Sequence, residues 1–172
     1  HDGGKLSENA PVAEASQSAF SYNPKDPSPT RGGFILTVPW EKGKKTARAG
    51  ALDQKPDVES RKDFISFTTD VLQEDCVLQG APTVKLFVSS DCVDTDFAAR
   101  LCDVFPDGRT LLVGDGIQRV QYRNGAKAEP MKPGEVYEIT VRLVPTAWTF
   151  QKGHAVRVIV TSSNYPRFDA NP

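Results

Sequence analysis

The clearest signal in the sequence is the run Tyr137-Glu138-Ile139-Thr140-Val141-Arg142-Leu143. Apolar and polar side chains alternate along it without a break. Successive side chains of a β-strand point to opposite faces of the sheet, so this pattern predicts a strand with one face in a core and the other in water.

The same alternation recurs in other short runs along the chain. They are marked by Val156, Val158 and Val160, by Phe97, Ala99 and Leu101, by Val84, Leu86 and Val88, and by Ile65 and Phe67. Turn residues stand between them at Pro106-Asp107-Gly108, Asn124-Gly125 and Lys132-Pro133-Gly134. Because no window shows a 3.6-residue period, we expect little helix and an all-β sandwich or jelly roll.

The organisation of the chain is predicted from where glycine, proline and polar residues gather. Residues 1–33 are rich in all three and are expected to be a lead-in segment that wraps the surface. Residues 34–172 are expected to form the sandwich, with an exposed loop over residues 41–51. Both ends of the chain have the character of cuts, so the cellular location, cytoplasmic or exported, is left open.

Composition argues against several classes of partner. Lys and Arg number 21 against 22 Asp and Glu, and this balance lacks the basic surface that nucleic acid requires. No apolar run is long enough to span a bilayer, so we expect no membrane partner. At 172 residues the chain is expected to be one domain with a sizeable core.

The sequence shows no combination of residues that is typical of a catalytic site. No serine lies in a Gly-x-Ser-x-Gly elbow, and His154, the one internal histidine, has no serine within reach along its own strand. The three cysteines, Cys76, Cys92 and Cys102, are an odd number without Cys-x-x-Cys spacing, and we expect buried free thiols. No catalytic residue, no cofactor and no metal site is predicted.

Two sets of residues allow alternative interpretations. Asp91, Asp94 and Asp96 could contribute to a calcium site, but neutralisation by neighbouring arginines is the favoured interpretation. Trp40, Trp148 and Tyr165 could form an aromatic platform for a sugar, although packing in a core or interface is favoured. A carbohydrate-binding or adhesive sandwich is therefore kept as the alternative function.

Several segments, spread in order from about Ser21 to the last residue, resemble the C-terminal domain of the X-Pro dipeptidyl-peptidase and cocaine-esterase-like serine hydrolases of bacterial type. The longest are 22–33, 59–63, 103–109, 150–154 and 162–169. Within the resembling segments we single out Asp53, Gln54, Asp94, Asp96, Asp103, Asp107, His154, Asn164 and Asp169 as structural motif residues.

The resemblance implies a jelly roll of the galactose-binding-like type, without a catalytic triad, packed on an upstream α/β-hydrolase domain that this chain lacks. It also implies that residues 34–52 approach the mouth of the active site, where Leu36, Val38 and Trp40 are candidates for lining an acyl pocket. The fragment is expected to be inactive alone. Because it stops short of the family's further C-terminal segment, an open sheet edge is expected to allow homo-oligomers.

Overall fold

The computed structural model describes residues 4–9, 16–35 and 49–171. The described residues contain strands and one short 3₁₀ turn but no α-helix, which confirms the all-β prediction. The elements are β1 Phe64–Thr68, β2 Cys76–Gly80, β3 Thr83–Val88, β4 Asp96–Val104, β5 Thr110–Arg119, η1 Val120–Tyr122, β6 Tyr137–Arg142, β7 Thr146–Phe150 and β8 Ala155–Thr161. Within these ranges no helix is long and apolar enough to cross a membrane.

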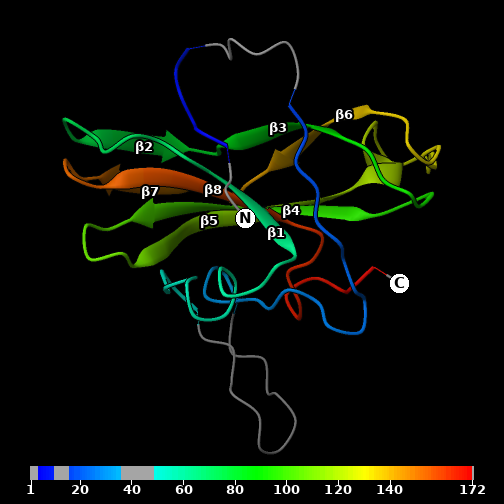
Figure 1. Ribbon diagram of the computed structural model, residues 1–172, viewed down its shortest axis with the longest axis horizontal. Coiled ribbons are helices and arrows are strands. Elements are labelled where there is room, and N and C mark those ends of the chain that lie inside the picture. Colours follow the sequence, from blue (N-terminus) through cyan, green and yellow to red (C-terminus); the bar gives the residue numbers. More distant parts are fainter. Residues whose placement is uncertain (1–3, 10–15, 36–48, 172) are drawn as a thin grey trace, which may run out of the picture.

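One layer is a four-stranded antiparallel sheet with the order β1-β8-β4-β5. Its two central strands, β8 and β4, connect parts of the chain that are about sixty residues apart, so the sheet forms only when distant segments meet. A β-bulge between Leu101 and Cys102 shifts the register of β4 against β5. Figure 1 shows this sheet running across the molecule below the second layer.

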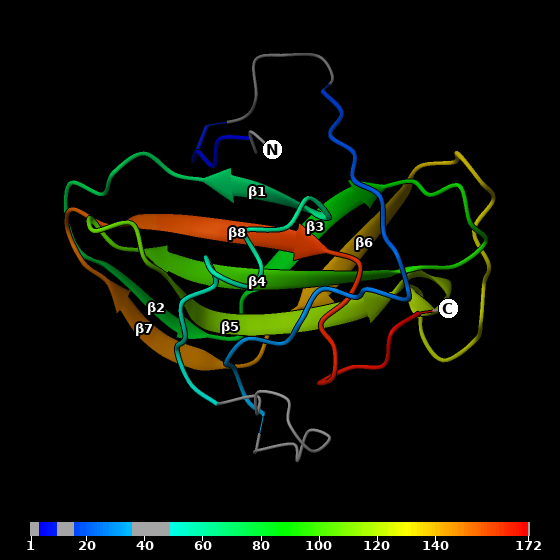
Figure 2. The same cartoon turned by 60° about the horizontal axis from the view of Figure 1, so that its bottom comes forward.

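The second layer is a long two-stranded ribbon, which we call the ribbon, made of β2 and β3 against β7 and β6. The register places Gly80 opposite Thr146 and Thr83 opposite Arg142, so two residues on one strand face three on the other. Prolines interrupt both strands here, at Pro82 and Pro145, and proline cannot donate to a ladder. The result is a bend that divides the ribbon into two pairs (Figure 2).

The two layers join at this bend. The backbone N–H of Val144 donates to the carbonyl oxygen of Asp115 on β5, at 3.1 Å. On the next residue of β5, Gly116, a Cβ would overlap the carbonyl oxygen of Arg142. Glycine is required there because the ribbon's backbone occupies the space of a side chain.

The main core lies between the layers and follows the predicted strand faces. On β6, Ile139 and Val141 are buried while Thr140 between them is exposed, as the alternation predicts. The buried members of this core are Val88, Phe97, Ala99, Leu101, Val120, Met131, Ile139, Val141, Leu143, Phe150 and Val160.

A second, smaller cluster covers the opposite face of the four-stranded sheet. It consists of Val58, Phe64, Cys102, Leu112 and Ile159. Strands β8 and β4 are therefore covered on both faces, since Ile159 and Val160 of β8 lie in different cores and residues 96–103 of β4 are all buried. The expectation of half-exposed strands at these positions is wrong. A central strand between two covered faces has no side for water.

The cysteine prediction is wrong for two of the three residues. Cys102 is buried in the middle of β4, but Cys76 begins β2 on the ribbon and Cys92 lies in the loop before β4, and both are exposed. All three are free thiols. Burial raises the pKa of the Cys102 thiol, with the nearby Arg100 opposing the rise.

Segments outside the strands cover the sheet face that the ribbon does not. The later part of the lead-in, up to residue 35, lies there together with residues 49–61 and 162–171, on the lower side in Figure 1. Backbone bridges attach the lead-in where Lys5 pairs with Thr68 at the end of β1 and where Pro29 pairs with Tyr165. The boundary between residues 33 and 34 stays a prediction.

Candidate functional site

Gly33 and Gly50 form a backbone neck on this covered face. The N–H of Gly33 donates to the carbonyl of Gly50 at 2.8 Å, and the N–H of Gly50 returns a bond of 3.0 Å. Both have positive φ, 80° and 102°, a region that favours glycine. The neck brings together the two ends of the segment that the resemblance singles out, residues 34–52. Gly33 directly precedes this segment, and Gly50 lies two residues before its last residue.

Gly33 lies directly on a buried ion pair. A Cβ on Gly33 would meet Asp115 Oδ1 at 3.2 Å and Arg167 Nη1 at 3.3 Å, and these two atoms form the pair. Asp115 is 1% exposed, so its charge has little help from water. The other carboxylate oxygen accepts a 2.7 Å bond from the side-chain amide of Asn164.

Asn164 connects this pair to a second buried cation, Arg100. One guanidinium nitrogen of Arg100 donates to Asn164 Oδ1 at 3.0 Å and to the carbonyl of Pro29 at 3.0 Å, while the other donates to Thr161 Oγ1 at 2.8 Å. Burial lowers the pKa of Arg100 to about 10, which leaves it charged at neutral pH. A buried charge is tolerated only with partners, and Asp115 supplies the opposite charge through the amide.

We refer to Arg100, Asp115, Asn164 and Arg167 as the neck network. It reaches the lead-in through the backbone, where Thr30 N–H donates to Tyr165 O at 2.6 Å and Thr30 Oγ1 donates to Asn164 O at 2.8 Å. The lead-in, the C-terminal residues and strand β4, which carries Arg100, are therefore bonded to one another immediately beneath Gly33.

Gln54 ties the two arms of the neck together. Its fully buried side chain donates through the amide nitrogen to the carbonyl of Arg31 at 2.7 Å and to that of Leu52 at 2.9 Å. Arg31 precedes Gly33 and Leu52 follows Gly50, so one side chain holds both. The preceding residue, Asp53, accepts the N–H of Thr110 at 2.9 Å and attaches the neck to β5.

Two of the three acidic residues near the start of β4, Asp94 and Asp96, pair with an arginine, as the sequence analysis favoured. Asp96 receives two bonds from Arg119, at 2.9 and 2.8 Å, and Asp94 lies 3.9 Å from the same guanidinium. Nowhere in the described ranges do three His, Cys, Asp or Glu side chains gather to hold a metal ion.

His154 and Trp148 share a buried carboxylate. Asp103 Oδ1 lies 2.9 Å from His154 Nδ1, and Asp103 Oδ2 accepts a 3.0 Å bond from the indole N–H of Trp148. The imidazole also stacks on Phe105, with ring centres 4.2 Å apart. Trp148 packs against the main core, so its ring is used in packing rather than offered as a sugar platform.

The remaining motif residues lie at the surface. Asp107 is in the exposed turn after β4, where it binds Arg109, and Asp169 is exposed near the C-terminal end. The pocket candidates Leu36, Val38 and Trp40 lie outside the described residues, and their pocket role stays a prediction.

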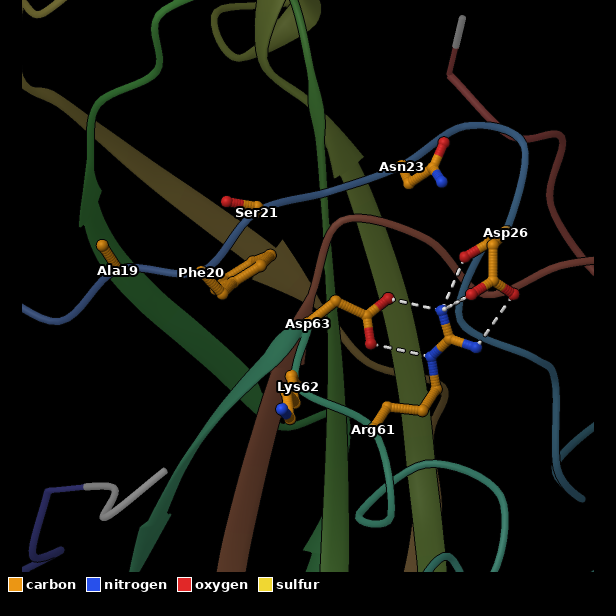
Figure 3. Close-up of a pocket in the computed structure, with 8 residues that line it drawn as sticks. All are labelled: Ala19, Phe20, Ser21, Asn23, Asp26, Arg61, Lys62 and Asp63. Atoms are coloured by element: carbon orange, nitrogen blue, oxygen red, sulfur yellow. Dashed lines mark hydrogen bonds and ion pairs between the residues drawn. The ribbon is translucent and has the colours of Figure 1, made fainter.

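A surface depression between the lead-in and the start of β1 is lined in part by a charge cluster (Figure 3). Arg61 donates to both carboxylate oxygens of Asp63, at 2.7 and 2.9 Å, and also to Asp26. Because this guanidinium is engaged from both sides, the cluster is best understood as an attachment of the lead-in, parallel to the one at Thr30.

Arg100, Asp115 and Arg167 were not singled out as site residues from the sequence. A signal was present, because Arg100 is a charged residue in the run Phe97-Ala98-Ala99-Arg100-Leu101, where every neighbour is apolar. A charge at such a position requires a buried partner. Its partners are 61 to 71 residues away, too far for spacing to indicate.

Comparison with known proteins adds the family. The family model of the X-Pro dipeptidyl-peptidase C-terminal non-catalytic domain matches residues 2–172. The chain belongs to this family. The resemblance to the cocaine-esterase-like hydrolases is thereby confirmed, and this family's domain is non-catalytic by description.

Relatives of this non-catalytic domain are found within longer enzymes. The chain is 38% identical over 170 residues to cocaine esterase from Rhodococcus sp. (strain MB1 Bresler), covering 98% of this chain and 28% of that protein. An aminopeptidase from a marine sediment archaeon, Thaumarchaeota archaeon, superposes with a TM-score of 0.80 at 31% identity, covering 98% of this chain and 29% of its own. An α-amino acid ester hydrolase superposes with a TM-score of 0.79 at 30% identity, covering 99% of this chain and 29% of its own. The chain thus spans less than a third of these relatives.

Proposed function

We propose that this domain packs on an α/β-hydrolase domain and holds residues 34–52 at the entrance of that domain's active site. The reaction of the whole enzyme is acyl transfer from an ester or an amide, the chemistry common to the names of its relatives. We further propose that the sandwich is a jelly roll of the galactose-binding-like type.

The observation that carries the proposal is the neck network beneath Gly33. The buried side chains of Arg100, Asp115 and Asn164 and the largely buried Arg167 are gathered under Gly33, which closes a segment together with Gly50. Burying charges is costly, and the same volume filled by apolar side chains is often as stable. An arrangement of this kind supports a role in fixing the position of the segment above it, in addition to stability.

The outer face of the ribbon supports the same choice of docking side. Its outward residues are mostly polar, with Val77, Phe87 and Ala147 as exceptions, and Lys85 and Glu138 form a 3.0 Å ion pair across the strands. A face of this composition is typical of contact with water. The covered face, which bears the neck and the 81%-exposed Phe34, is therefore the proposed docking side.

The test compares two glycines with equal space and similar backbone strain. Gly50 in the neck and Gly134 in the turn before β6 both have positive φ, and at neither does any atom lie within 4 Å of the position that a Cβ would take. In the full-length enzyme, Gly50→Ala should change the ratio of kcat/KM for large against small acyl groups, whereas Gly134→Ala should leave it unchanged. Equal ratios in both variants would refute the proposal.

The pocket role of Trp40 is tested separately from the role of the neck. Trp40→Ala in the full-length enzyme should alter kcat/KM differently for large and small acyl groups if the side chain lines the pocket. An unchanged selectivity would remove Trp40 from the pocket while leaving the role of the neck intact.

A further inference from the structure

The start of the connection between β5 and β6, residues 120–136, is braced by Arg123. Arg123 donates to the carbonyl of Val120 at 3.1 Å and to that of Glu129 at 2.5 Å, and its guanidinium lies 4.4 Å from the ring centre of Tyr137. The N–H of Glu129 donates to Gln121 O at 2.7 Å and closes the base. The exposed tip, residues 124–128, lies between these attachments.

Asn124 begins the tip, and its side chain provides a further attachment. The amide nitrogen Nδ2 donates to Glu129 Oε2 at 2.7 Å. The next residue, Gly125, has φ of 130° and open space around it. Its N–H reaches the carbonyl of Tyr122 at 3.2 Å, the long end of the hydrogen-bond range, so this bond resists opening only weakly.

We propose that Asn124 is a site of spontaneous deamidation, and that the carboxylate formed there loosens the tip of this connection. The backbone nitrogen of Gly125 attacks Cγ of Asn124 and loses its proton to solvent base, while the side-chain nitrogen takes up a proton from solvent and leaves as ammonia. A cyclic imide results. Water then opens the imide at either carbonyl, giving aspartate or its isomer with the backbone routed through the side chain.

The other four asparagines are poor candidates for reasons visible in the chain. Asn23 and Asn171 precede prolines, which have no backbone N–H to attack with. Asn164 is buried, and its amide is fixed between Arg100 and Asp115. Asn9 precedes Ala10, whose side chain hinders the approach that glycine permits.

The product replaces an attraction by a repulsion. The amide of Asn124 donates to the carboxylate of Glu129, but an aspartate at this position has no donor and adds a second negative charge at hydrogen-bond distance. Like charges in contact disfavour the closed arrangement. The isomer also lengthens the backbone by one atom inside a tight turn, so both products open the tip.

The first experiment locates the modification. The full-length protein is incubated at mildly alkaline pH, and peptide mapping by mass spectrometry follows the exchange of an amide for a carboxyl group at each asparagine. Asn124 should convert several-fold faster than Asn9, and Asn124→Gln should abolish the signal in its peptide. Equal rates at Asn124 and Asn9 would overturn the proposed site.

The second experiment tests the consequence. Limited trypsin digestion should cut after Lys127, in the exposed tip, several-fold faster in Asn124→Asp than in the unmodified protein. Adding Glu129→Gln, which removes the opposing charge, should return the rate toward the original. An unchanged rate in Asn124→Asp would refute the loosening, and failure of the second change to restore it would refute repulsion as the cause.

Discussion

The two outer faces of the sandwich are built by different rules. The ribbon's outer face alternates simply, with mostly polar residues outward and cross-strand pairs such as Lys85 and Glu138 exposed to water. The outer face of the four-stranded sheet is covered, and beneath the cover lie two arginines and an aspartate that water hardly reaches. The ribbon face meets water through exposed polar side chains, whereas on the covered face the buried charge of Arg100 is bonded to the backbone of the lead-in.

The largest difference in stability between the two faces is expected when the central charge of the neck network is removed. Asp115→Ala leaves Arg100 and Arg167 without their counter-charge, and should lower the free energy of unfolding by about 3 to 5 kcal/mol. Chemical denaturation of the variant, with Glu138→Ala on the ribbon face as control, measures the difference. A loss no larger than that of the control would show that the network does not need its carboxylate.

The junction between the two layers gives the next effect. In Gly116→Ala the new methyl group meets the carbonyl of Arg142, which belongs to backbone and cannot move easily, so a loss of about 3 kcal/mol is expected. Gly114→Ala is the matched control, since its Cβ would make ordinary contact, at 3.5 Å from Val144. Similar thermal shifts in both would contradict the close approach at the bend.

A smaller effect is expected where β4 meets the ribbon. Trp148→Phe keeps an aromatic ring but leaves Asp103 Oδ2 without its donor, at a cost of about 1 to 3 kcal/mol. The control is Thr149→Ala, an exposed neighbour on β7. Denaturation midpoints that coincide for the two variants would mean that the carboxylate finds another partner.

The smallest effect belongs to the exposed ion pair of the ribbon. Lys85→Ala removes a pair whose side chains are 61% and 50% exposed, and should change stability by about 0 to 1 kcal/mol, decreasing with salt. A salt titration of the unfolding free energy checks this expectation. A large loss of unfolding free energy that does not depend on salt would mean that this ion pair behaves as a buried one, and the two outer faces would then not differ as described.

Much of the ribbon and the core strands could be predicted from the sequence, because their signal is local. Strands β3, β4, β6 and β8 lie where apolar residues alternate, and the three predicted turns contain glycines of positive φ. Strand β5 was not predicted, since Gly114-Asp115-Gly116 in its middle has the composition of a turn. Gly116 is tolerated in a strand because the ribbon's backbone passes close by, which no local pattern records.

The site was less predictable for the same reason. Gln54, Asn164 and Asp103 were singled out through the resemblance, and the structure places the first two at the neck. The roles of Arg100 and Asp115 depend on partners in the lead-in and in residues 162–171, such as Pro29 and Arg167. Polar residues at buried positions depend on long-range pairing, and spacing along the chain cannot supply it.

The reciprocal bonds between Gly33 and Gly50 also bear on how enzymes of this family can diversify. The neck is closed by backbone atoms of the two glycines themselves, so its closure does not require particular side chains in the segment between them, which we call the insert. Doubling the length of such an insert costs only about 0.6 kcal/mol in closure entropy. We therefore expect this position to accept exchange of the whole insert between relatives, as an interchangeable cassette on an unchanged sandwich.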